Sequence, residues 1–377
     1  MAKRAIFEEV REAPVATAPK GGLIDGAKQG SRRAVRIWLM LLFALVVVMI
    51  AVGGLTRLTD SGLSITEWRP VTGAMPPVTA EDWAAEFELY RQIPEYQLQN
   101  QGMSLAEFKV IYWWEWGHRQ LGRVIGLVWA LGFFGLLLTR KIPAGWTGRL
   151  LALGVLGGLQ GAIGWWMVSS GLTGTMLDVA SYRLATHLGL AFVILGLITW
   201  YVVSMGRSAS DLLQARRLAD GRMMGWATLV LGVVFLQIVW GAMVAGIDAG
   251  RSYTEWPLMG GGFLPPTMWD LQPVWRNLTE NAGTVQFIHR VLGYVAFALI
   301  VAAAWVAGGA ANRRVTLAFH GVAYMAVIQM GLGIMTVIYA APWHLAILHQ
   351  FGAVLLLALT VLARHRAKYP VAQSVRS

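Results

Sequence analysis

Cysteine is absent from the 377 residues of this chain. A disulfide framework, a thiolate metal site, an iron–sulfur cluster and a cysteine nucleophile are therefore all excluded. Any metal chemistry must use histidine, carboxylate or methionine ligands instead. Charge is also scarce, because Asp, Glu, Lys and Arg make up only 14% of the residues while 56% are hydrophobic. This composition excludes a disordered chain and argues against a soluble domain, since lipid is the natural solvent for so much apolar surface.

Acidic residues are outnumbered, because 20 Asp and Glu stand against 31 Lys and Arg and leave a net charge of +11. Such an excess can indicate nucleic-acid binding, but here the basic residues gather in short segments between apolar runs. That distribution is typical of a membrane protein, and we expect no nucleic-acid partner. Runs long enough to cross about 30 Å of hydrocarbon lie near 37–57, 112–138, 150–169, 184–205, 224–246, 285–307, 316–340 and 344–363.

The distribution of charge predicts the orientation of these eight spans. Most of the Lys and Arg residues lie on one side, which comprises the N-terminal tail, the loops at 140–149 and 206–222, the turn at 312–314 and the C-terminal tail. The positive-inside rule places this side, with both termini, in the cytoplasm. The long loops at 58–111 and 247–284 then face outward, to the periplasm or an equivalent space.

The chain also contains an internal repeat. DSGLSITEW (60–68) aligns without gaps with DAGRSYTEW (248–256), GHRQLGR (117–123) corresponds to IHRVLGY (288–294), and THLGLA (186–191) corresponds to LHQFGA (348–353). Four spans per repeat is an even number, so both halves cross the membrane in the same direction. We therefore predict an all-α integral membrane protein with eight transmembrane helices, arranged as two tandem, pseudo-twofold-related four-helix bundles.

The repeat and the apolar runs together predict five segments. These are a cytoplasmic N-terminal tail at 1–36, an N-terminal bundle at 37–205 with its outer loop 58–111, a cytoplasmic linker at 206–222, a C-terminal bundle at 223–364 with its outer loop 247–284, and a cytoplasmic tail at 365–377. Membrane lipid is an expected partner of both bundles.

Four of the seven histidines occupy equivalent places in the two halves, namely His118 and His187 in the first half and His289 and His349 in the second. Their spans all enter from the outer side, so we expect the imidazoles within about two turns of that face. A single histidine in a span is usually a packing residue, but two matched pairs favour ligands. Zinc or di-iron would require three or four ligands including carboxylates. Two facing imidazoles in an apolar bundle are typical of hexacoordinate haem iron, so we expect two haem pockets.

A small residue follows each of these histidines by four positions: Gly122, Ala191, Gly293 and Ala353. Position i+4 lies on the same helix face, so a small side chain there leaves room for a flat macrocycle beside its axial ligand. Tight packing between membrane helices explains the same pattern, and both interpretations stay open.

The remaining histidines lie near the ends of spans. His320 starts the seventh span, His344 follows a tryptophan at an interface, and His365 lies in the basic tail. We interpret them as polar surface residues rather than ligands. Gln160 and Gln329, on the third and seventh spans, are interpreted as polar contacts inside the bundles.

The two halves differ beside the first histidine. The offset of 171 between the histidine motifs places Gln286 where the first half has Glu115. A carboxylate at membrane depth is costly and suggests function, and Glu115 shares a helix face with the histidine three residues later. It is either an ion-pair partner of Arg119 or Arg123 or a general acid or base beside a reacting macrocycle. Arg119, like Arg290 in the second half, either orients haem propionates or extends to the interface.

These residues resemble a known family. The segment GGLTRLTDSGLSITEWRPVTGAMPP (53–77), the E-x-x-H-R-x-x-G segment at 115–122 and the repeated histidine pairs are similar to those of haem A synthases of the bacterial and mitochondrial type. The resemblance extends over about 35–365. It implies an oxidoreductase that converts haem O to haem A for terminal oxidases, by oxidising the C8 methyl of the porphyrin to a formyl group through successive hydroxylations.

The resemblance also implies roles for individual residues. The substrate haem would be bound by His118, His187, Arg119 and Gly122, the cofactor haem b by His289, His349, Arg290 and Gly293, and the catalytic carboxylate would be Glu115, with the four histidines as axial ligands of iron. Haem O synthase and oxidase assembly factors would be partners. The location implied is the bacterial inner membrane, with both haem sites near the periplasmic face. Some members carry a cysteine pair in the first outer loop, and no such redox pair can operate here.

Two other functions are consistent with parts of the pattern. A dihaem b-type cytochrome would use the same histidine pairs to carry electrons without modifying haem. A duplicated transporter without haem would share only the repeat. The difference between Glu115 and Gln286 favours the haem-modifying enzyme over the cytochrome, because a carrier has no need of one catalytic carboxylate.

Overall fold

The computed structural model describes residues 23–174 and 176–372, and over these residues the fold is all-helical, as predicted. The β-type pairing within them is an isolated bridge between Met259 and Gly262. Eight of the described helices are long and apolar enough to cross a membrane, which confirms the predicted spans. They are α1 (Leu23–Leu58), α4 (Leu105–Leu138), α5 (Thr147–Val168), α6 (Ser181–Met205), α8 (Gly221–Gly246), α10 (Ala282–Ala307), α11 (Arg313–Ile338) and α12 (Trp343–Lys368).

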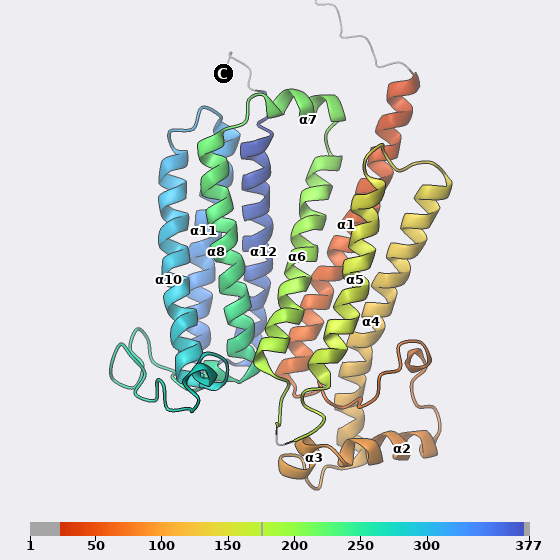
Figure 1. Cartoon of the computed structure of the whole chain (residues 1–377), viewed down its shortest axis with the longest axis vertical. Helices are drawn as coiled ribbons and strands as arrows, with labels where there is room; N and C mark the ends of the chain where they lie inside the picture. Colours follow the sequence, from red (N-terminus) through yellow and green to blue (C-terminus); the bar gives the residue numbers. More distant parts are fainter. Residues whose placement is uncertain (1–22, 175, 373–377) are drawn as a thin grey trace, which may run out of the picture.

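Short helices occupy the connections. The first outer loop contains η1 (Thr72–Ala74), α2 (Ala80–Arg91) and α3 (Pro94–Leu98), the linker contains α7 (Ala209–Arg216), and the second outer loop contains η2 (Ala249–Arg251), η3 (Val274–Arg276) and α9 (Asn277–Glu280). In Figure 1, α7 lies at the same end of the molecule as the start of α1 and the end of α12. The helices α2 and α3 lie at the opposite end.

Most spans begin before the apolar runs that predict them, because polar capping residues lie outside those runs. The apolar run of α4 starts near 112, but the helix starts at Leu105, where Ser104 accepts a hydrogen bond from the backbone of Glu107 and the Glu107 carboxylate accepts one from the backbone of Ser104. This reciprocal capping box satisfies two backbone donors that a helix start otherwise leaves unpaired. Asn281 and Asn312 cap α10 and α11 through their side-chain oxygens.

The eight spans pack in two groups of four. Contacts between neighbouring helices close a ring of α1, α4, α5 and α6 and a second ring of α8, α10, α11 and α12. The rings meet where α6 contacts α8 and α12, and where α1 contacts α12, and Figure 1 shows the two groups side by side. This arrangement fits the predicted bundles and linker, and the twofold relation between the bundles stays a prediction.

The largest apolar core extends across the junction of the two rings. It includes Leu195 on α6 and Met223 on α8, both almost completely buried. On the outward faces the apolar side chains stay uncovered, because Leu131 on α4, Trp305 on α10 and Tyr324 on α11 are 67%, 83% and 76% exposed. Apolar surface of this extent on long helices is suited to lipid rather than water.

The first outer loop has a core of its own. Trp83 and Tyr90 of α2 are buried against Phe108 and Tyr112, which lie on the extension of α4 beyond its apolar run. The rings of Tyr90 and Phe108 lie 5.2 Å apart, and those of Trp83 and Tyr112 lie 5.0 Å apart at 72°. Aromatic pairs in these geometries add to the stabilisation from buried area. The loop therefore forms a packed cap over the outer end of the first ring.

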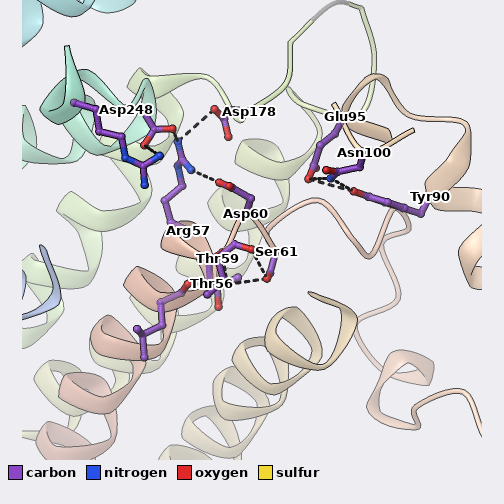
Figure 2. Close-up of polar contacts among 12 residues, drawn as sticks. Thr56, Arg57, Thr59, Asp60, Ser61, Tyr90, Glu95, Asn100, Asp178 and Asp248 are labelled. Atoms are coloured by element: carbon purple, nitrogen blue, oxygen red, sulfur yellow. Dashed lines mark hydrogen bonds and ion pairs between the residues drawn. The ribbon is translucent and has the colours of Figure 1, made fainter. Parts of the chain in front are cut away.

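One arginine joins the outer ends of both rings. Arg57, in the last turn of α1, forms ion pairs with Asp60 at 3.0 Å, Asp178 at 3.3 Å and Asp248 at 3.0 Å. Figure 2 shows its guanidinium group between these three carboxylates, which come from the first outer loop, the α5–α6 connection and the end of α8. Asp60 and Asp248 are equivalent in the repeat and adopt similar left-handed backbones, with φ of 47° and 50°. The position equivalent to Arg57 is Ala245, so the second half has no counterpart.

Replacing this arginine with glutamine is expected to destabilise the protein by about 1–3 kcal/mol, because three converging carboxylates lose their shared cation in a partly buried site. The measurement is the midpoint of thermal unfolding of the full chain in detergent. Arg69→Gln is the matched control, since the Arg69 side chain is 45% exposed and surface ion pairs contribute little. Equal unfolding midpoints for the Arg57→Gln and Arg69→Gln variants would contradict the proposed role of Arg57.

Candidate functional site

The two histidines of the second ring face each other across its interior. His289 lies on α10 and His349 on α12, and their ring centroids are 6.4 Å apart with the ring planes at 84°. A metal-to-imidazole bond is about 2 Å long and the ring centroid lies ~1 Å further back, so two imidazoles on opposite sides of one metal ion have centroids about 6 Å apart. The observed separation therefore fits a single iron with two axial imidazoles.

The histidines of the first ring lie on the equivalent helices. His118 lies on α4, as His289 lies on α10, and His187 lies on α6, as His349 lies on α12. Among the described residues, no group of three or more His, Asp or Glu side chains could hold a metal ion. Zinc and di-iron sites of the usual kinds need such groups, so neither is supported by the described part of the chain. An iron held by two imidazoles and a macrocycle is not subject to this requirement.

Each of the four imidazoles lies against a glycine on a neighbouring helix. A Cβ atom would lie 3.2 Å from the His118 ring at Gly53, 2.8 Å from the His187 ring at Gly164, 3.0 Å from the His289 ring at Gly241 and 2.9 Å from the His349 ring at Gly333. Contacts that short require a neighbour to move, so any larger residue would displace the ring. These glycines were not predicted from the sequence. Gly53 and Gly241 are nevertheless 188 residues apart and Gly164 and Gly333 are 169 residues apart, as expected for equivalent positions of the repeat.

Three of the imidazoles also contact a glutamine. The side-chain amide nitrogen lies 3.2 Å from His187 Nδ1 for Gln160, 3.1 Å from His289 Nδ1 for Gln237 and 3.2 Å from His349 Nδ1 for Gln329. Gln160 and Gln329 were predicted as polar contacts inside the bundles, and their hydrogen bonds confirm that prediction, whereas Gln237 was missed. The Oε1 atom of each glutamine is buried without a hydrogen-bond partner among the described residues. A buried polar group without a partner is costly, so a donor such as the N–H of a metal-bound imidazole suits this position.

Glu115 is buried, with 2% of its surface exposed, and both of its oxygens are hydrogen-bonded. Its Oε1 accepts hydrogen bonds from Arg119 Nε at 3.0 Å and Nη2 at 2.6 Å. Its Oε2 accepts them from Ser64 Oγ and from the backbone N–H of Ile65, both at 2.8 Å. The ion pair with Arg119, one of the two predicted alternatives, is therefore present. The hydrogen bonds from Ser64 and Ile65 attach the first outer loop to α4.

In the second ring, the position equivalent to Glu115 is an amide, Gln286. Gln286 donates to the backbone oxygen of Tyr253 at 3.0 Å, which also accepts from Arg290 Nη2 at 2.8 Å. The corresponding bond of the first ring runs from Arg119 Nη2 to the backbone oxygen of Ile65, also at 2.8 Å. The two clusters therefore share the arginine-to-carbonyl bond but differ at positions 115 and 286. Glu115 accepts four hydrogen bonds, whereas Gln286 donates one and its Oε1 is buried without a partner among the described residues.

The two arginines are directed toward the outer loops. Arg119 donates to the backbone oxygen of Glu67 at 3.2 Å and Arg290 to that of Glu255 at 3.0 Å, so each reaches the TEW segment of its own half. Arg290 Nε is buried without a partner among the described residues. These bonds explain why an arginine follows each of the two histidines. The orientation of haem propionates by these arginines stays a prediction.

Gly122 and Gly293 also have equivalent surroundings. A Cβ atom at Gly122 would lie 3.5 Å from Met49 Cε, and one at Gly293 would lie 3.2 Å from Gln237 Nε2. Both glycines thus allow close approach of the preceding span, α1 or α8, which supports the packing alternative. Room for a macrocycle beside them stays a prediction.

The other histidines have different surroundings. His365 was predicted in the C-terminal tail, but α12 continues to Lys368 and buries His365 at 2% exposure. Its ring lies 4.9 Å from that of Trp200, and its Nε2 lies 3.2 Å from Ser204 Oγ. His365 is therefore a packing residue between the two rings, at the end remote from the outer loops.

The second outer loop leaves a cavity of about 220 Å³ beside the second histidine pair. Its walls include Trp256, Phe263, Phe287, Arg290 and Tyr294. The indole nitrogen of Trp256 donates to the hydroxyl of Tyr294 at 3.0 Å, which fixes the TEW segment to α10. The loop is therefore held over the end of the second ring by side chains one turn from His289.

A second buried carboxylate lies in the first outer loop. Glu95 on α3 is 3% exposed and accepts hydrogen bonds from Tyr90 Oη at 3.2 Å and Asn100 Nδ2 at 3.3 Å, as Figure 2 shows. Its Oε2 is buried without a partner among the described residues. Burial, opposed by the hydrogen bond from Tyr90 and reinforced by the nearby carboxylates Asp178 and Asp60, raises the pKa of Glu95 to about 8. Glu95 is therefore largely protonated at neutral pH.

This raised pKa predicts how the stability of the first outer loop depends on pH. The folded loop binds the proton of Glu95 more tightly than the unfolded loop, whose carboxyl has the ordinary pKa of 4.5. The free energy of unfolding the loop therefore falls as pH rises from about 4.5 to about 8, by up to about 1.4 kcal/mol per pH unit, and levels off above that range. Glu95→Gln cannot ionise and should remove this dependence. Hydrogen exchange of the α2–α3 backbone at several pH values measures it, and an unchanged pH dependence in the variant would disprove the assignment.

The fold and the site together define a class: a polytopic helical membrane protein with two rings of four helices, each of which carries a pair of histidines supported by glycines. Comparison with known proteins is more specific. A family described as cytochrome oxidase assembly protein, COX15-CtaA, matches residues 36–361. The chain is 65% identical to the heme A synthase of Dinoroseobacter shibae, over 99% of this chain and 98% of the relative. It is 60% identical to that of Ruegeria pomeroyi, over 99% of both chains, and 58% identical to that of Cereibacter sphaeroides, over 99% and 98%. This chain belongs to the COX15-CtaA family.

Proposed function

We propose that this protein is a haem A synthase of the bacterial inner membrane, which oxidises the C8 methyl of haem O to a formyl group through successive hydroxylations. The high identity to relatives named heme A synthase over nearly the whole chain supports the activity. The observation that carries the assignment within the molecule is the difference between Glu115 and Gln286 at repeat-equivalent positions, each of which is hydrogen-bonded to the outer loop of its own half. One ring has a buried carboxylate beside its histidine, and the other has a neutral amide.

The first ring is the proposed substrate site. His118 and His187 would hold haem O there, and His289 and His349 would hold haem b in the second ring, where the 6.4 Å separation of the imidazoles supports iron binding. The bound haems would supply the redox chemistry of the oxidation. The residues of the chain hold the imidazoles in place through glycines and glutamines and exclude water by the packed first outer loop.

Glu115 is the proposed proton acceptor. It lies one helical turn before His118, on the same face of α4, and its carboxylate is held by Arg119 and Ser64 at distances of 2.6–3.0 Å. A positioned carboxylate accelerates proton transfer by roughly 10²–10⁴-fold. With water as the source of the hydroxyl oxygen, conversion of R–CH3 to R–CH2OH releases two electrons and two protons. The electrons would leave through the bound haems, and Glu115 can accept one proton at Oε2 when the Ser64 hydroxyl rotates away.

The orientation that we propose places both termini in the cytoplasm and the histidine pairs near the periplasmic face. The concentration of Lys and Arg at the end of the molecule that carries α7 supports this orientation through the positive-inside rule. Haem O synthase is a proposed partner, because it would supply the substrate from within the same membrane. Oxidase assembly factors are proposed partners for delivery of the product.

Glu115→Gln should abolish formation of the formyl group while leaving the haem content unchanged. Loss of the carboxylate removes the proton acceptor, and we expect a fall in product of about 100-fold or more. The second ring shows that glutamine is tolerated in this cluster, as Gln286 keeps a hydrogen bond to the loop. The haems are extracted from membranes and separated by chromatography. Glu88→Gln is the control, since Glu88 is exposed in the outer loop. Normal haem A formation by the Glu115 variant would favour a dihaem cytochrome instead.

His289→Ala should remove haem b and leave haem O bound, because an axial ligand is lost from the second ring only. The measurement is the ratio of the two haems extracted from the purified variant, with His118→Ala as the reciprocal variant. Loss of haem O from the His289→Ala variant would reverse the assignment of the two rings.

A further inference from the structure

A short motif recurs on the helix that supports each histidine. QGAIG (160–164) supports His187, QIVWG (237–241) supports His289 and QMGLG (329–333) supports His349. In each, the glycine lies against the imidazole and the glutamine, one turn away on the same helix face, contacts its Nδ1. The equivalent motif for His118 is MIAVG (49–53). Three supports are therefore Gln-x-x-x-Gly, and the fourth is Met-x-x-x-Gly.

Each glutamine holds both the ring and the backbone of its histidine. The amide nitrogen donates to the histidine carbonyl oxygen at 2.9 Å from Gln160, 3.0 Å from Gln237 and 2.9 Å from Gln329. These bonds join neighbouring helices at the depth of the ligand. They restrain the rotation of the imidazole and the position of the helix that carries it.

Met49 occupies the position of Gln237 in the first ring. Both residues precede the supporting glycine by four positions, and both lie against the repeat-equivalent glycines Gly122 and Gly293. A thioether donates no hydrogen bond and accepts only weakly. Among the described residues, no side chain makes the equivalent hydrogen bond to His118, so packing against Gly53 is what positions this ring.

The loss of such a partner has a known effect on metal sites. Outer groups that hydrogen-bond a metal-ligating histidine fix its orientation, and removing one typically costs 10–100-fold in metal affinity or activity. A cofactor that stays bound requires high affinity on both sides of the iron. A substrate that must leave as product requires one axial ligand that releases readily.

The packing of the helix that carries His118 supports the same conclusion independently. In the most apolar stretch of α4, 6% of the residues are buried inside the protein. In the corresponding stretch of the equivalent helix α10, 28% are buried. Leu127 and Leu131 on α4 are 58% and 67% exposed. A helix with so few buried side chains has little to oppose a small outward movement, which would open the first ring toward lipid.

We propose that Met49 makes His118 the releasing axial ligand, so that the haem of the first ring exchanges with the membrane while the haem of the second ring stays bound. This inference rests on the proposed function, because it assumes a substrate haem in one ring and a cofactor haem in the other. Met49 is a positioning residue, because its side chain contacts α4, the helix that carries His118, and does not touch the reacting atoms.

The test exchanges the two residues between the rings. The full chain, loaded with its haems and purified in detergent, is mixed with an excess of apomyoglobin, and the transfer of each haem is followed by absorbance and by chromatography of the extracted haems. For the unchanged protein we expect haem O or A to leave faster than haem b. Met49→Gln should slow departure from the first ring about tenfold or more, and Gln237→Met should accelerate departure of haem b by a similar factor.

Two further variants keep the outcome decisive. Met49→Leu retains an apolar side chain of similar size and should leave the departure rate of the first-ring haem within about twofold, and a large change would mean that the thioether itself binds the haem. Val48→Gln places the same amide on the exposed neighbouring position and should have no effect on either rate.

If Met49→Gln and Gln237→Met both leave the rates unchanged while the protein contains haem, the inference is wrong and the proposed function stands. If the purified protein contains no haem, the proposed function itself is wrong.

Discussion

The interior of each ring depends on the close approach of a glycine backbone to an imidazole. Wherever a histidine projects inward, the neighbouring helix presents a residue without a side chain, at Gly53, Gly164, Gly241 or Gly333. Membrane helices lack a strong hydrophobic drive to associate with one another, so small residues that allow close packing supply much of the contact between them. These glycines therefore both bring the helices together and hold the ligands that the rings enclose.

Duplication of one four-helix unit produced two sites that can be compared atom by atom. The arginine-to-carbonyl bonds, the left-handed aspartates and the glycine supports are present twice. Against that common background, three positions differ in chemistry: Glu115 against Gln286, Met49 against Gln237, and Arg57 against Ala245. The first ring has the charged and the weakly bonding residues, and the second has the neutral amides. This division is consistent with the proposal that one haem is transformed and the other retained.

Much of the architecture could be predicted because it depends on composition and periodicity. The eight spans, the repeat and the four histidines follow from apolar runs and from matching segments of the two halves. The ends of the helices could not be predicted from hydropathy, because residues such as Ser104 and Asn281 cap polar turns outside the apolar runs. The continuation of α12 through His365 was missed for the same reason, since a basic helical turn resembles a tail.

The details of the site were predicted less completely. The contrast between Glu115 and Gln286 is visible once the halves are aligned, but the aligned halves do not show that Ser64 and Ile65 complete the hydrogen bonding of the carboxylate. Those partners come from a loop whose path depends on tertiary packing. The supporting glycines and Gln237 lay within the repeat and went unnoticed, because alignment of the histidine segments alone leaves out the helices that face them.

The ion pairs of Arg57 have a consequence for the order in which the protein is made. Arg57 lies in the last turn of α1, whereas its partners Asp178 and Asp248 come later in the chain, in the α5–α6 connection and just after α8. The arrangement cannot be complete until the fifth membrane-spanning helix, α8, has been synthesised and inserted. During biogenesis Asp60 and Asp178 are available to this residue first, and its third ion pair forms only after the second half of the chain arrives. The ion pair between Arg57 and Asp248 therefore joins the two rings only after α8 has been inserted.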